Sequence, residues 1–305
     1  MFGRKKIKVS EWASVMNKKE YPLFMQAVED YFRQKGEPYI IADGIVKLEE
    51  NDFEFGLNNL MQMCAKSRPE DYDGIISFHF GQLIESKKFE TQFKEISGDF
   101  EKVKQYLAVR LYDKEYIECI GEDIFVRRHF AGELYAALVW DFPAAIQNVL
   151  KDDIEKWGKT EDELFVIGME NVRNNYEMKT EEVDIDEDFI YGINYEHFFV
   201  PNILFDLDKH PEFIGKGGTI VAVPTRNMAM IYPIRDMKVV NALNKFFWNV
   251  PNFYSEGPGS LTKEIYWYHN GQFEVLEFEI EKENVKFTPS QAFMDLLNNM
   301  SETEL

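Results

Sequence analysis

The most constraining feature of this chain is the run Thr219-Ile-Val-Ala-Val223, in which four apolar residues follow one another without polar alternation. A half-buried strand alternates apolar and polar residues, so an unbroken run predicts a strand covered on both faces. The turn sequence Pro224-Thr-Arg-Asn227 follows, and a second apolar run covers 228–234. We therefore expect a central antiparallel hairpin in a sheet with packed layers on both sides.

Two dipeptides, Asp43-Gly44 and Asn270-Gly271, each lie between β-rich arms. A two-residue type I′ turn needs positive φ at both central positions, which Asp or Asn followed by Gly tolerates best. The sequence thus predicts hairpins at 39–48 and 264–278. Together with several amphipathic helices they indicate an α+β fold with mixed or antiparallel sheets.

The other segments follow helical or strand-like patterns. Ser10 is a candidate cap for a short first helix, and Thr160-Glu-Asp-Glu163 is a capping box ahead of a helix at 164–176. The acidic stretch 181–188 indicates a loop or an edge strand. Apolar residues three and four apart predict further helices at 18–35, 53–64, 70–93, 143–157, 236–248 and after Ser290. Short β-rich runs predict strands at 106–112, 116–120, 124–128, 134–140, 189–193 and 197–200.

The chain of 305 residues is long enough for two domains or one large α+β domain. Helical patterns with one hairpin dominate up to about residue 103, and strands become frequent after it. We predict an N-terminal helical region at 1–103 and an α+β domain at 104–305, with one continuous fold as the alternative.

Charge narrows the possible partners. The chain has 34 Lys and Arg against 54 Asp and Glu, a formal charge of −20. Such a field repels phosphate backbones and anionic membrane surfaces, so we expect neither nucleic acid nor membrane as a partner. With 45% hydrophobic and 15% aromatic residues, the chain is globular rather than disordered.

The expected compartment is the cytoplasm. Cys64 and Cys119 lie in apolar contexts without metal-ligand spacing, which predicts two buried, reduced thiols. The opening residues carry basic groups but no apolar core of a signal peptide. No window reaches the roughly 18–20 uncharged apolar residues that a membrane span needs.

Familiar ligand motifs are incomplete in this chain, so we expect no metal and no cofactor. Gly215-Lys-Gly-Gly218 precedes a strand rather than a helix and is interpreted as a turn, not a phosphate loop. Two acidic triplets have calcium-loop spacing, but neither has the required Gly and Glu, so they are interpreted as solvated faces. The triplets are Asp184, Asp186 and Asp188, and Asp206, Asp208 and His210. The five histidines form no zinc-type pair, and no nucleophile motif occurs.

Two polar clusters are candidate binding residues. Arg127-Arg128-His129 comes at the end of an apolar strand, and Thr225-Arg226-Asn227 forms the tip of the central hairpin. Loop tips on rigid strands often carry binding residues, and Arg226 offers a planar fork of donors to a carboxylate or phosphate. The alternative for each cluster is a surface arginine that neutralises nearby carboxylates, such as those of 181–188.

Three segments of the second half carry a family resemblance: Asp162–Arg173, Gly218–Ile234 and Tyr266–Glu274. In their order they resemble the YtpQ-like family of uncharacterised bacterial proteins, over roughly residues 130–280. This chain has Gly168 where the family's helix pattern has Ala. The resemblance implies a bacterial, intracellular α+β protein and transfers no catalytic residue.

Two classes of function remain open. The first is a non-enzymatic protein-interaction or ligand-binding protein, whose acidic surface favours a basic protein partner and whose aromatics supply interface anchors. The second is a hydrolase-type enzyme with a site assembled from dispersed residues, for which Arg128, His129, Asp141 and Arg226 are candidates. Mimicry of DNA by the acidic surface is a third hypothesis. Whether the side chains of the dispersed set converge in one pocket separates the first two.

Overall fold

The computed structural model describes residues 11–13, 15–49, 53–121, 124–143, 145–185, 188–256, 259–282 and 284–303. Ser10 and Asp186 lie outside these residues. The chain divides into two compact units, residues 1–95 with 142–145, and residues 96–141 with 146–305. The boundary expected at 103/104 stays a prediction. The fold is α+β with antiparallel sheets, as the sequence predicted.

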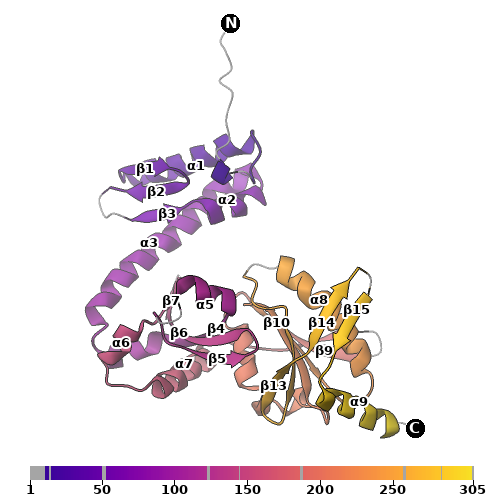
Figure 1. The fold of residues 1–305 in the computed structure, drawn as a ribbon. Helices are drawn as coiled ribbons and strands as arrows, with labels where there is room; N and C mark the ends of the chain where they lie inside the picture. Colours follow the sequence, from indigo (N-terminus) through magenta and orange to yellow (C-terminus); the bar gives the residue numbers. More distant parts are fainter. Residues whose placement is uncertain are drawn as a thin grey trace. The chain divides into compact units, whose positions relative to one another are not determined.

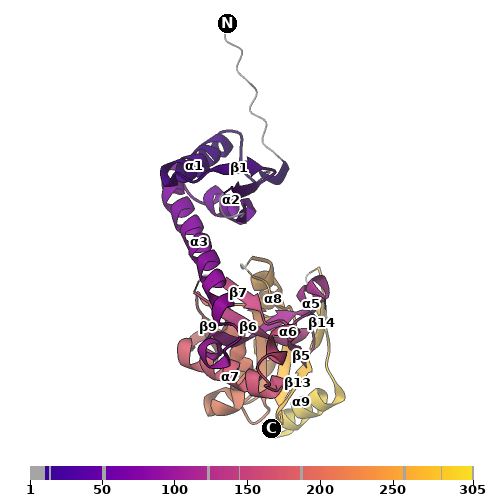
Figure 2. The same ribbon diagram turned by 90° about the vertical axis from the view of Figure 1, so that its left-hand side faces the viewer.

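The first unit packs helices against a small antiparallel sheet. The Asp43-Gly44 hairpin is confirmed, because φ is 47° at Asp43 and 78° at Gly44. The helix predicted at 53–64 is partly wrong, because its first residues pair with the hairpin as a third strand. The sheet consists of β1 (Tyr39–Ala42), β2 (Ile45–Leu48) and β3 (Glu54–Gly56). The helices are α1 (Glu20–Lys35), α2 (Asn58–Ala65) and the long α3 (Tyr72–Ile96) (Figures 1 and 2). Short 3₁₀ turns η1 (Glu11–Ala13) and η2 (Pro69–Asp71) complete it.

Aromatic side chains fill the core of this first unit. Phe32 of α1 and Phe80 of α3 are fully buried, with ring centroids 4.6 Å apart. Cys64 of α2 is also buried there, and burial raises the pKa of its thiol to about 11. Cys119 is exposed, so the expectation of two buried thiols is wrong for the second one.

A six-stranded antiparallel sheet organises the second unit, in the order β13-β12-β10-β11-β9-β8. Its central strand β10 (Thr219–Thr225) is buried at every position and pairs with a neighbour on each side. Asn270 and Gly271 have φ of 50° and 74°, which confirms the second hairpin. The other strands are β8 (Glu181–Ile185), β9 (Asp188–Asn194), β11 (Met228–Pro233), β12 (Ile265–His269) and β13 (Gln272–Val275). The acidic β8 lies at the sheet's edge.

Both faces of this sheet are covered, which is why the run at 219–223 lacks polar alternation. Ile220 and Ala222 belong to a core shared with Phe246 and Phe293. That core contains helices α8 (Val239–Glu256) and α9 (Gln291–Thr303) and the hairpin β14 (Glu277–Glu281) with β15 (Asn284–Thr288) (Figure 1). On the opposite face the 3₁₀ turns η4 (Val200–Phe205) and η6 (Pro211–Phe213) contact β11, and Asp208 of η5 (Leu207–Lys209) accepts a hydrogen bond from the Tyr268 hydroxyl at 2.6 Å. There the Thr219 hydroxyl donates to the Phe213 carbonyl at 2.5 Å.

A second sheet of this unit orders its strands β4-β6-β5, with β7 paired to β6. The strands are β4 (Leu107–Asp113), β5 (Arg127–Ala131), β6 (Leu134–Phe142) and β7 (Ala145–Asn148). Helix α7 (Glu161–Asn175) begins at the expected capping box, in which Thr160 and Glu163 exchange hydrogen bonds. The side-chain amide of Asn171 donates to the Leu107 carbonyl at 2.8 Å, and that of Asn202 donates to the Val109 carbonyl at 2.7 Å. These two amides satisfy the outward carbonyls of β4, an edge strand.

Three local expectations in this region were wrong, and the strand expected at 124–128 is shifted to β5, so that Arg127 begins this strand rather than ending it. Residues 116–120 belong to helix α5 (Lys114–Ile120), because the Asp113 side chain caps it by accepting from the Tyr116 amide at 2.7 Å. Residues 143–157 contain strand β7 and only a short helix α6 (Lys151–Glu155), since pairing with β6 overrides the helical spacing. Residues 197–200 lead into η4 instead of forming a strand. The remaining short elements are α4 (Phe100–Val103) and η3 (Lys104–Tyr106). No helix in the described ranges has the length and apolar character to cross a membrane.

Candidate functional site

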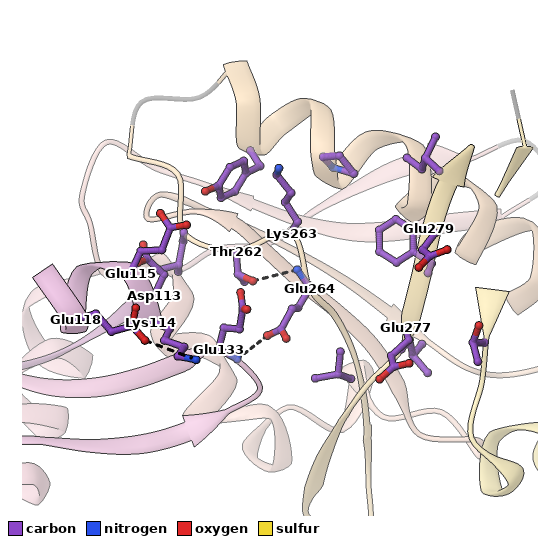
Figure 3. A pocket seen from close by; sticks show the side chains of 18 residues that line it. Asp113, Lys114, Glu115, Glu118, Glu133, Thr262, Lys263, Glu264, Glu277 and Glu279 are labelled. Atoms are coloured by element: carbon purple, nitrogen blue, oxygen red, sulfur yellow. Dashed lines mark hydrogen bonds and ion pairs between the residues drawn. The ribbon is translucent and has the colours of Figure 1, made fainter. Parts of the chain in front are cut away.

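A groove with a cavity volume of about 820 Å³ lies in the second unit. Its walls come from segments far apart in the sequence: helix α5, the β5–β6 turn, the end of α8, the segment 261–264, and the strands from β13 to β15. Figure 3 shows the carboxylates of α5 on one side and those of β14 on the opposite side. Glu133 and Glu264 lie between them (Figure 3).

The groove is strongly acidic. Its lining contains two lysines, Lys114 and Lys263, and seven carboxylates. The carboxylates are those of Asp113, Glu115, Glu118, Glu133, Glu264, Glu277 and Glu279. Lys114 pairs with Glu118 at 3.6 Å, and Lys286 outside the groove pairs with Glu279 at 3.4 Å. Three of the carboxylates are exposed and have no ion-pair partner among the described residues, namely Glu115, Glu133 and Glu277.

Apolar side chains also line the groove. Leu261 and Leu276 are almost fully buried, and the partly buried Phe278 lies beside them in the lining. Pro251 and Tyr254 of α8 contribute further apolar surface. A pocket with apolar walls and a few charged groups is the usual form of a binding site. Here the charged groups are mostly of one sign.

Glu264 is held in place by the neighbouring sheet. Its Oε2 atom accepts a hydrogen bond from the Glu133 amide at 2.8 Å and one from the Tyr266 hydroxyl at 2.5 Å. Gly132 has φ of 52°, and a Cβ at this position would lie 2.2 Å from Oε2 of Glu264. Glycine therefore permits both the turn and the close approach of the carboxylate. Burial raises the pKa of Tyr266, and the Glu264 charge raises it further.

Tyr254 and Lys263 form a contact between an aromatic ring and a cation in the groove. The Lys263 ammonium lies 4.7 Å from the centroid of the Tyr254 ring, a cation–π contact. Burial raises the pKa of the Tyr254 phenol, and the charges of Glu115, Asp113 and Glu133 raise it further. The nearby carboxylates of Glu115, Asp113 and Glu133 therefore favour a positively charged group at this ring.

The predicted cluster at the central hairpin stays together. The buried Thr225 donates its hydroxyl to Oδ1 of Asn227 at 2.8 Å. The Asn227 carbonyl accepts from the Tyr195 amide at 3.1 Å. The guanidinium of Arg226 lies 3.9 Å from the Phe198 ring centroid. None of these three hairpin residues lines the acidic groove.

The other predicted cluster is divided by the alternation of strand β5. Arg128 pairs with Asp162 at 3.1 Å, and its guanidinium lies 3.6 Å from the Phe165 ring centroid. Arg127 lies over the Tyr135 ring at 5.2 Å. His129 is exposed, and its Nε2 atom lies 2.9 Å from the Gly132 carbonyl oxygen. Neighbouring residues of a strand point to opposite faces, so Arg127 and His129 both contact the Tyr135 ring while Arg128 does not, and the three side chains do not form one site.

The dispersed residues considered for a hydrolase do not line the groove either. Asp141 accepts a hydrogen bond from the Tyr176 hydroxyl at 2.5 Å, whereas Arg128 pairs with Asp162 and His129 contacts the Gly132 carbonyl. Burial raises the pKa of Asp141, and the Tyr176 hydrogen bond opposes this effect. Within the described part of the chain, no group of three or more His, Cys, Asp or Glu is placed to hold a metal ion.

Two sets of candidate binding residues were not predicted from the sequence. The groove carboxylates come from segments that lie more than a hundred residues apart in the sequence, so no local motif indicates them. The sequence predicts Arg110, which contacts Phe198 together with Arg226, only as part of a strand at 106–112. A single charge within the run Leu107–Tyr112 was the one available signal.

Comparison with protein-family models, curated proteins and solved structures finds no match to this chain.

Proposed function

We propose that this protein is a non-enzymatic binding protein that holds a basic, amphipathic segment of a partner protein in the acidic groove. The observation that carries the proposal is the composition of the groove, seven carboxylates and two lysines beside apolar side chains. Lysine and arginine have long apolar stems and charged ends, so they suit such a surface. The stems pack on the apolar side chains while the ends reach the carboxylates.

Size and charge support the same occupant. A volume of about 820 Å³ lies within the usual range of roughly 300–1,000 Å³ for ligand pockets, enough for a few side chains of a peptide. The formal charge of −20 adds a long-range field that speeds encounter with a basic partner. Lys263 over Tyr254 already places one ammonium group in the groove. A partner lysine would meet similar surroundings at the three unpaired carboxylates.

A hydrolase remains the alternative, and it has less support. Arg128 and His129 have partners of their own and do not line the groove. The proposal also includes two expectations from the sequence, membership of the YtpQ-like family and a cytoplasmic location. It further includes the expectation that nucleic acid is not a partner, because the chain is negatively charged.

Neutralising the three unpaired carboxylates should weaken peptide binding. The probe is a fluorescein-labelled peptide that alternates Lys and Leu, followed by fluorescence anisotropy. The variant carries Glu115→Gln, Glu133→Gln and Glu277→Gln. Each exposed charge pair contributes about 0.5–1 kcal/mol, so we expect the Kd to rise by about tenfold or more.

A charge-matched variant separates the groove from the overall field. Glu155→Gln, Glu182→Gln and Glu196→Gln remove the same charge at exposed sites outside the groove. We expect this variant to keep a Kd within about twofold of the wild type. Equal losses in the two variants would mean that only net charge matters. No binding of the Lys-Leu peptide by the wild type would reject the proposed occupant.

A further inference from the structure

Arg226 occupies an unusual position at the tip of the central hairpin. Its guanidinium lies over Phe198, and its Nε atom is buried without a hydrogen-bond partner. Gly259 packs against this atom so closely that a Cβ there would lie 2.2 Å from it. The terminal Nη atoms also lack hydrogen-bond partners but are not among the buried atoms. The fork of Arg226 therefore presents free donors on an accessible edge.

Arg110 of β4 approaches the same ring. Its guanidinium lies 5.5 Å from the Phe198 centroid and 4.6 Å from the Tyr112 centroid. Its Nε atom is likewise buried without a partner. Tyr112 stacks on Tyr116 with centroids 4.2 Å apart and planes at 10°. The stack with Tyr116 fixes the Tyr112 ring that the Arg110 guanidinium contacts.

The two guanidinium groups repel one another. Burial lowers the pKa of Arg226, and the Arg110 charge lowers it further. Neither arginine forms an ion pair with a carboxylate of the described residues. Other arginines of this acidic chain do form such pairs: Arg33 with Asp30, Arg68 with Asp71, Arg128 with Asp162, Arg173 with Asp206 and Arg235 with Asp188. With 54 carboxylates in the chain, two arginines that contact the same Phe198 ring and have no ion-pair partner among the described residues require an explanation.

We propose that Arg110 and Arg226 together bind an oxyanion, the carboxylate or phosphate group of a small ligand. Planar guanidinium forks match the paired oxygens of both groups. An anion held by the two forks offsets their repulsion and occupies donors of Arg226 that the protein leaves free. Neither arginine lines the acidic groove, so the site is separate from that of the proposed partner peptide.

Binding is tested on the full chain with sodium phosphate and sodium acetate in separate titrations, at ionic strength held constant with sodium chloride. The readout is the ¹H–¹⁵N signal of each arginine Nε group. We expect saturable shifts for Arg110 and Arg226 and none for Arg173, which already pairs with Asp206. A response to phosphate alone assigns a phosphate ligand, and a response to acetate alone assigns a carboxylate. No saturable shift in either titration overturns the proposal.

Thermal melting of variants separates binding from a structural role. Saturating anion should raise the melting temperature of the wild type by roughly 5 °C, because it binds the folded state only. Arg226→Met should lose this rise yet melt no lower than the wild type without anion, since one of two repelling charges is gone. Arg173→Met is the matched control, which should melt lower and keep the rise. A lower melting temperature of Arg226→Met without anion would overturn the proposal by making Arg226 structural.

Discussion

Val221→Asp is expected to destabilise the second unit strongly. Val221 is fully buried in β10, between Ile231 on β11 and Tyr266 on β12. An aspartate there would place an unpaired charge, or a neutralised carboxyl without partners, inside a covered sheet. Such substitutions cost about 3–5 kcal/mol, a large part of the stability of a typical domain. Circular dichroism during thermal melting measures the loss.

The same substitution at the edge of the same sheet provides the control. Val183 lies in the edge strand β8 and is 46% exposed. Val183→Asp keeps its charge in water, so we expect a change of about 0.5 kcal/mol. If Val221→Asp melted like Val183→Asp, strand β10 would not be the covered centre of the sheet.

Gly218→Ala is the second change with a large expected effect. Gly218 has φ of 87°, and a Cβ at this position would lie 2.4 Å from the backbone oxygen of Tyr268. Its carbonyl accepts from the Ile234 amide at 2.9 Å, so the turn is tied to the chain on both sides and cannot move freely. Backbone strain and overpacking together should cost about 3 kcal/mol or more. Urea unfolding measures this free energy.

Gly271→Ala separates strain from clash. Gly271 has φ of 74°, but no heavy atom lies within 4 Å of the position of an added Cβ. Only the left-handed conformation opposes alanine there, at about 1 kcal/mol. Equal losses for Gly218→Ala and Gly271→Ala would show that the approach of Tyr268 has no energetic consequence.

Local preferences made several elements of the fold predictable. The Asp43-Gly44 and Asn270-Gly271 turns follow from the few residues that accept positive φ in succession. The start of α7 follows from one capping box. The glycine cluster at 215–218 is a turn, as interpreted from its place before a strand, and the amide of Gly218 donates to the Gly215 carbonyl at 2.9 Å. In each case the deciding atoms are within a few residues of one another.

Elements failed where a distant strand competed with the local pattern. Residues 145–148 have helical spacing, yet they pair with β6 because a sheet edge was open to them. The strand expected at 116–120 became α5 because the cap at Asp113 outweighs β-branched composition. Propensities differ by tenths of a kcal/mol per residue, so one tertiary pairing or one cap reverses them.

The candidate binding sites depend on tertiary structure more than any single helix or strand does. The sequence by itself determined the net negative charge and the fully covered strand β10. The charge depends only on composition, and the covered strand depends on neighbouring residues along the chain. Only the tertiary structure placed the Glu133 amide beside the Glu264 carboxylate, and Arg110 and Arg226 on the same Phe198 ring; the members of each pair are more than a hundred residues apart in the sequence. A binding site depends on distances between side chains, and those distances are set by how strands pair and pack rather than by any local rule.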